Sequence, residues 1–234
     1  MVQGGAFGLG NPALRDRDGK RRVIVEFCCS EDSRLGRYAE HHSLPCKIIR
    51  ITEAIDANSP EGISLALNGC RRRHALLWSS IPCTGGTVWQ RWNRKRPGGE
   101  EKLQVHLTKF RELWRTFSTV ARMAKAKGTP IAIEWPRGCD YWSWPEVSSL
   151  IQELRLKMVN FEGCALGLTS VVTGLPIKKP WRIATDCNHI IEAFWNCRCS
   201  GTCEHSPCAG RDTKRTEGTP RSLLHSCTVR MHHT

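Results

Sequence analysis

Short apolar runs that alternate with helical patterns constrain the fold of this chain more than any other feature. The runs have the length of buried strands and lie at 23–27, 47–51, 75–81, 130–134, 158–162 and 181–185. The helical patterns lie near 32–42, 60–69, 102–126 and 145–157. Repeated strand–helix units favour a mostly parallel sheet with right-handed crossovers. The sequence therefore predicts an α/β fold with a Rossmann-like sheet and helices on both faces.

The segment 102–126 carries the clearest helical pattern. Glu100 and Glu101 lie at its start, and Lys125 lies near its end before Gly128, as the helix dipole favours. One face is an apolar stripe that consists of Leu103, Leu107, Phe110, Leu113, Trp114, Phe117, Val120 and Ala124. A stripe at this spacing predicts a long helix packed against the sheet.

Two of the apolar runs lead into reactive side chains. Pro82 and Cys83 follow the run that begins at Ala75, and Glu134 follows Ile133. Because ligands bind at the carboxyl ends of parallel strands, we expect Cys83 and Glu134 to meet at one edge of the sheet, with Cys28 beside them. A thiol and a carboxylate placed in this way suit attack on a pyrimidine ring. The alternative is a small buried cysteine and a glutamate in a salt bridge.

Three short motifs in this order resemble those of the cytosine-5 DNA methyltransferases. That family has Phe-Cys-Gly at the S-adenosylmethionine site, a Pro-Cys nucleophile and a Glu-Asn-Val acid. Here Phe27-Cys28-Cys29, Pro82-Cys83 and Glu134-Trp135-Pro136 stand at these places. The resemblance covers roughly residues 23 to 185 and implies a methyltransferase-like α/β domain over 23–195.

The resemblance implies that a methyl group passes from S-adenosylmethionine to a base in DNA or RNA. Cys83 would add to the ring as a nucleophile, and Glu134 would hydrogen-bond or protonate a ring nitrogen. The target base would first leave its stack, at a cost of about a few kcal/mol.

The resemblance also places the cofactor. S-adenosylmethionine would lie over Glu26, Phe27, Cys28 and Pro82, and an acid after the second strand would bind its ribose. Glu53 and Asp56 are the candidates for that acid, with a capping or surface role as the alternative for each.

The sequence departs from the family in its first loop and in its length. The loop at 29–36 is acidic and has a single glycine, and the large segment that reads DNA sequence is missing. These departures favour a second interpretation: a catalytically inactive α/β domain, derived from a mobile element, that binds nucleic acid.

Positive charge is concentrated after the Cys83 loop. The chain has a net charge of +13, and four basic residues adjoin Trp89 and Trp92, namely Arg91, Arg94, Lys95 and Arg96. A second basic group consists of Lys178, Lys179 and Arg182. Cationic and aromatic side chains together suit a nucleic-acid backbone with a stacked base. The alternative is a solvated loop.

The C-terminal segment 196–234 is rich in cysteine and histidine. Five candidate ligands lie within it, Cys197, Cys199, Cys203, His205 and Cys208. Zinc takes four such ligands in a tetrahedron, so we expect a zinc knuckle built from four of the five. The alternative is a flexible cysteine-rich tail.

Composition limits the class of protein. No stretch approaches the ~20 apolar residues of a membrane span, and the glycine-rich, basic residues 1–22 differ from a secretory signal. We expect a disordered arm there. The 13 cysteines, an odd count, favour a reducing intracellular compartment, the nucleus or cytoplasm, with free and metal-bound thiols. Oligomeric state is not indicated.

Overall fold

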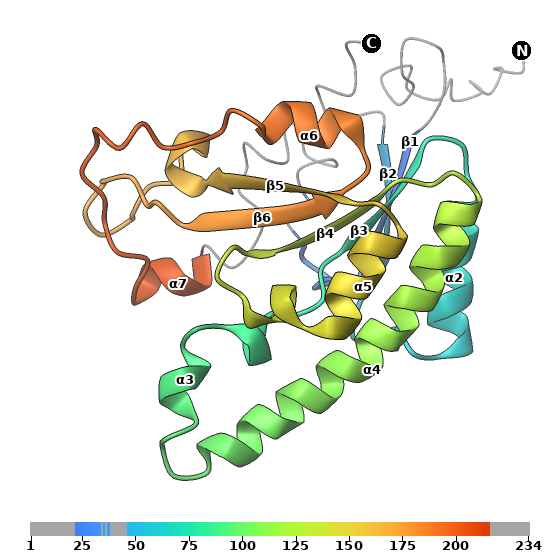
Figure 1. The fold of residues 1–234 in the computed structure, drawn as a ribbon, viewed down its shortest axis with the longest axis horizontal. Helices are drawn as coiled ribbons and strands as arrows, with labels where there is room; N and C mark the ends of the chain where they lie inside the picture. Colours follow the sequence, from blue (N-terminus) through green and yellow to red (C-terminus); the bar gives the residue numbers. More distant parts are fainter. Residues whose placement is uncertain (1–21, 34, 36, 38–45, 216–234) are drawn as a thin grey trace, which may run out of the picture.

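A six-stranded mixed sheet forms the centre of the computed structural model, which describes residues 22–33, 35, 37 and 46–215. Its strands are β1 (Arg22–Phe27), β2 (Cys46–Ile51), β3 (Ala75–Ser79), β4 (Ile131–Pro136), β5 (Lys157–Glu162) and β6 (Pro180–Thr185). Their order is β2-β1-β3-β4-β6-β5 (Figure 1). β1 pairs in parallel with β2 and β3, and β3 with β4, whereas β6 is antiparallel to β4 and β5. The fold is therefore α/β with a mostly parallel sheet.

Helices and short 3-10 turns connect the strands. The helices are α2 (Pro60–Cys70), α3 (Gln90–Asn93), α4 (Gly99–Ala126), α5 (Pro145–Glu153), α6 (Asn188–Phe194) and α7 (Arg211–Arg215). The 3-10 turns are η2 (Thr84–Gly86), η3 (Asp140–Ser143) and η4 (Gly163–Leu166). η2 follows β3, η3 follows β4 and η4 follows β5, so each begins near the carboxyl end of a strand.

The predicted strands match β1 to β6, with shifts of one or two residues at several ends. β3 ends at Ser79 instead of 81, and α5 ends at Glu153 instead of 157. The longer helix was wrong because Arg155 adopts a positive φ of 54°, which a helix cannot continue through. α6 was not predicted. The predicted helix near 32–42 lies mostly outside the described residues, as do 1–21 of the arm and 216–234 of the C-terminal segment.

Alternate strand residues enter two separate apolar clusters, because successive side chains of a strand point to opposite faces. The first cluster contains Val25, Leu77 and Ile133, and it also takes in the buried residues of α4 and α5. The second contains Leu76 and Ala132 and takes in the buried residues of α6. α6 contacts β5 and β6, whereas α4 contacts α2, β3 and β4.

Aromatic residues dominate the first cluster near the carboxyl end of β4. The Phe110 and Tyr141 rings stack with centroids 3.6 Å apart, and Trp135 lies 5.9 Å from Phe110 and 4.9 Å from Trp142. Each large ring buries much apolar area, so hydrophobic packing stabilises this end of the sheet. In the described part of the chain, no helix is long and apolar enough to cross a membrane.

Candidate functional site

The parallel pairing of β1, β3 and β4 brings their carboxyl ends to one edge of the sheet. Cys28 follows β1, the Cys83 loop follows β3, and Glu134 lies near the end of β4. The strand order reverses here, since the chain passes from β1 to β2 on one side and returns to β3 on the other. In open α/β sheets ligands bind at such a switch point. We call this region the carboxyl edge.

The loop that carries Cys83 is anchored on both sides. Trp135 Nε1 donates a hydrogen bond of 2.7 Å to the Ile81 carbonyl, and Gly86 N donates to the Cys83 carbonyl at 2.9 Å. A Cβ at Gly86 would lie 2.7 Å from Cys139 Sγ, so only glycine permits this close approach. Cys83 itself is partly buried. The loop is thus held in one position over the aromatic residues.

Glu134 is the most perturbed acid of the carboxyl edge. Its Oε1 is buried without a hydrogen-bond partner among the described residues. Burial raises the pKa of Glu134 to about 8, although the charge of Lys179 opposes the shift and that of Glu26 adds to it. Removal from water disfavours the charged form of a carboxyl group. Glu134 therefore keeps its proton at neutral pH and can donate it.

Glu26 makes contacts that hold the first loop against the sheet. It is 4% exposed and accepts hydrogen bonds from Ser33 Oγ at 2.5 Å and Ser80 Oγ at 3.2 Å. Burial raises the pKa of Glu26. Cys28 has a φ of 61°, in the left-handed region that favours glycine. The chain turns sharply at the end of β1, at the place where the cytosine-5 DNA methyltransferases have a glycine-rich loop.

The two acids considered for the ribose have structural partners. The Glu53 side chain is 93% exposed and lies 3.5 Å from Lys109 Nζ. Asp56 Oδ1 accepts a hydrogen bond of 2.9 Å from Asn58 N. These contacts agree with the alternative in which each is a surface or turn acid.

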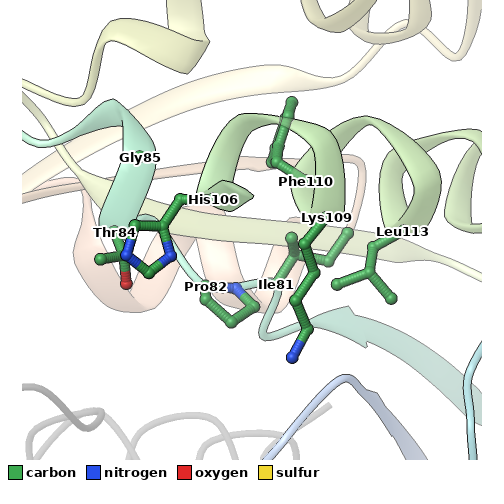
Figure 2. A pocket seen from close by; sticks show the side chains of 8 residues that line it. All are labelled: Ile81, Pro82, Thr84, Gly85, His106, Lys109, Phe110 and Leu113. Carbon is green, nitrogen blue, oxygen red and sulfur yellow. The ribbon is translucent and has the colours of Figure 1, made fainter. Parts of the chain in front are cut away.

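A small hollow lies between the Cys83 loop and α4. Pro82 and Thr84 line it from the loop, and His106 and Lys109 line it from α4 (Figure 2). Sequence reasoning missed His106. The available signal was its position one helical turn before Phe110, at the border of the apolar stripe of α4.

The first basic group lies on and after α3. Arg91 forms a salt bridge of 2.9 Å with Asp140, and Arg94 forms one of 3.2 Å with Glu100. Lys95 Nζ lies 5.7 Å from the centre of the Trp92 ring, and Arg96 is exposed. Trp89 and Trp92 are 64% and 68% exposed. Isolated exposed apolar residues are normal on a protein surface, whereas exposed apolar patches can mark an interaction site.

The second basic group lies at β6. Lys179 Nζ is 4.7 Å from the centre of the Trp181 ring. Arg182 Nε donates a hydrogen bond of 2.8 Å to Asn160 Oδ1, and burial lowers the Arg182 pKa. Lys178 is exposed. Of these three cations, Lys178 is therefore the most open to a polyanion.

A group of thiol and imidazole side chains could hold a metal ion. The Cys164 Sγ, Cys199 Sγ and a ring nitrogen of His205 all lie within 4.8 Å of one another. Cys199 and His205 were predicted, and Cys164, in η4, was not. Cys197 and Cys208 are not part of this group as the described residues define it. Cys197 Sγ instead lies 3.2 Å from the Ala193 carbonyl.

Comparison with known proteins adds no relative. A scan against family models, a search of curated proteins and a search of solved structures each found no match to this chain.

Proposed function

We propose that the protein is an S-adenosylmethionine-dependent methyltransferase of the cytosine-5 type, which acts on a base in DNA or RNA. Cys83 is its nucleophile and Glu134 its proton donor. The observation that supports the proposal most is the buried carboxyl of Glu134, with a pKa raised to about 8, at the edge that also carries the Cys83 loop.

The chemistry requires opposite protonation states of the two groups. Cys83 must lose its proton, because the thiolate is the nucleophile, and its sulfur adds to carbon 6 of the ring. Glu134 must keep its proton, so that it neutralises negative charge on the ring nitrogen. S-adenosylmethionine, when bound, would supply the methyl group to carbon 5, and its sulfonium–methyl bond would break to release the neutral thioether. Loss of the carbon 5 proton and release of the Cys83 thiolate restore the ring.

The cofactor would be held at the switch point between β1 and β3, with Glu26, Phe27, Cys28 and Pro82 around it. The left-handed turn at Cys28 brings the backbone close to this position without a glycine.

The proposal includes a Rossmann-like, doubly wound sheet. It is supported by α4 and α5 in one apolar cluster and α6 in the other.

The proposed partner is nucleic acid, bound by the surface around α3. Two exposed tryptophans suit stacked or extruded bases, and the adjacent cations suit phosphates.

We assign zinc to the Cys/His group because thiolates and imidazole are the ligands that zinc prefers.

A second function has its own supporting observation. Glu26, which the first function assigns to the cofactor, already accepts hydrogen bonds from Ser33 of the acidic loop and from Ser80. A domain that binds nucleic acid without catalysis is therefore the competing candidate.

Two measurements separate these functions. Calorimetry with S-adenosylmethionine tests the cofactor site, and transfer of a labelled methyl group to DNA and RNA tests the reaction. Under the proposal Cys83→Ser abolishes transfer and leaves cofactor binding intact, whereas the matched control Cys46→Ser transfers normally. Nucleic-acid binding without cofactor binding at millimolar concentration supports the second function, and transfer by Cys83→Ser contradicts the assigned nucleophile.

A further inference from the structure

A fourth potential ligand lies beside the Cys164–Cys199–His205 group. Cys203 Sγ is 3.7 Å from Cys199 Sγ and 3.3 Å from His205 Nε2. Cys199 Sγ is also 3.3 Å from His205 Nε2. His205 Nε2 therefore faces two thiols at equal distance.

These three distances match three of the six edges of a zinc tetrahedron, and Cys164 Sγ lies within 4.8 Å of Cys199 Sγ and of a His205 ring nitrogen. Zinc bonds of about 2.3 Å to sulfur and about 2.0 Å to nitrogen give tetrahedral edges of about 3.8 Å between two sulfurs and about 3.5 Å between sulfur and nitrogen. A disulfide requires its sulfurs about 2.05 Å apart, and Cys199 and Cys203 are free.

We infer that Cys164, Cys199, Cys203 and His205 form a closed structural zinc site that attaches the segment 197–213 to the sheet. The inference takes from the proposed function only the choice of zinc as the metal. With four protein ligands the site has no open position for a reacting water, which is the mark of a structural site.

The ligands come from two parts of the chain. Cys164 lies in η4, directly after β5, whereas the other three lie beyond α6. Figure 1 shows the chain between α6 and α7 curving around the end of β5. Gly201 N donates a hydrogen bond of 3.3 Å to Cys199 Sγ, which helps to fix the position of that sulfur.

The attached segment has no apolar core of its own. Among the described residues beyond Phe194, the buried side chains are polar, those of Ser206 and Asp212. Asp212 accepts hydrogen bonds from Ser170 Oγ and Val171 N. A segment with so little apolar burial gains its order from metal binding, as small metal-bound domains do.

A buried carboxylate connects this site with the carboxyl edge. Cys199 N donates a hydrogen bond of 3.0 Å to Glu162 Oε2. Glu162 Oε1 accepts one of 3.1 Å from Arg137, which directly follows β4. The zinc site is thus fixed to the strand that carries Glu134, and Glu162 orients the backbone beside one of its ligands.

The test is elemental analysis of the full chain purified without added metal, together with cobalt substitution. We expect one equivalent of zinc, and a cobalt form with the absorption of a tetrahedral thiolate site. Cys164→Ser and Cys203→Ala should lower the zinc affinity by more than the about 10–100-fold that loss of an outer-shell partner costs. Cys203→His keeps one equivalent, because histidine also binds zinc. The control Cys46→Ser keeps one equivalent as well.

Several outcomes would overturn the inference. Folded protein with no bound metal, or with Cys199 and Cys203 joined in a disulfide, rules out the site. Full zinc binding by Cys164→Ser together with its loss in Cys208→Ser shows a knuckle confined to the C-terminal segment. One equivalent of a different metal, lost in the same variants, keeps the four ligands and refutes only zinc. None of these readings depends on methyl transfer.

Discussion

The carboxyl edge and the metal-binding segment are held in place by different forces. The edge lies on packed aromatic residues, among them Phe110, Trp135 and Tyr141, which are all nearly or fully buried. The segment 197–213 depends on hydrogen bonds and on the Cys/His group. Hydrophobic burial needs no cofactor, whereas a metal-ordered segment depends on its ion and on pH. The two regions should therefore respond to different treatments.

The largest effect is expected for Glu134→Gln, and it has opposite signs for stability and activity. The folded protein holds this proton up to a pKa of about 8, while the unfolded chain releases it near 4.5. The folded state therefore binds more protons between these values, and stability falls as pH rises through the window. In the wild-type protein the unfolding free energy decreases by about 4 kcal/mol up to pH 8 for this reason, and Glu134→Gln removes that decrease. Transfer activity of the variant should decrease about a hundredfold.

Urea denaturation at pH 5 and pH 8 measures this effect. The wild-type protein should lose stability between the two values, and Glu134→Gln should lose much less. Glu53→Gln, which removes an exposed acid, serves as the control and should resemble the wild type. An equal change in unfolding free energy between pH 5 and pH 8 for all three proteins would show that Glu134 is not protonated at neutral pH.

The next effect concerns the anchor of the Cys83 loop. Trp135→Phe removes the hydrogen bond to the Ile81 carbonyl and part of the buried ring, at a cost of about 2 kcal/mol in unfolding free energy. Zinc content should stay the same, because Trp135 lies in the aromatic cluster and not in the metal group. A parallel decrease in zinc content would show that the two regions fold as one unit.

Metal removal should act on the other region. Treatment with a chelator should lower hydrogen-exchange protection between Cys199 and Asp212 tenfold or more, since local order there rests on the ion. Protection in β3 and β4 should change little. Cys203→Ala, which already lacks a ligand, should show only a small further decrease. A uniform decrease in hydrogen-exchange protection across the sheet would show that the metal stabilises the whole domain and not only this segment.

The smallest effect is expected at the nucleic-acid surface. Reversing Arg91, Arg94, Lys95 and Arg96 to Glu should weaken binding and flatten its dependence on salt, by about one unit of slope for each phosphate that the variant no longer neutralises. Reversing the exposed Arg71, Arg72 and Arg73 near the opposite end of β3 is the control. Fluorescence anisotropy at several salt concentrations provides the measurement. Changes in both variants in proportion to the number of charges reversed would mean that binding follows net charge alone.

The sequence predicted much of this architecture from local patterns. Apolar runs of strand length located β1 to β6, and the apolar stripe located α4, because burial imposes a period on nearby residues. The sequence also predicted that β3 and β4 end at one edge, since the carboxyl ends of parallel strands meet. The predicted end of α5 was wrong because buried apolar residues continue through Leu154 and Leu156. The apolar pattern therefore gives no sign of the positive φ at Arg155 that ends the helix.

Only the tertiary structure decided which distant groups meet. β6 enters the sheet antiparallel between β4 and β5, and no local pattern specifies that pairing. Cys164 joins Cys199 and His205, whereas Cys197, one of the five candidate ligands in the sequence, has its Sγ 3.2 Å from the Ala193 carbonyl. Periodicity reports which face of an element is buried, whereas a ligand set and a shifted pKa depend on the side chains that other elements bring within reach.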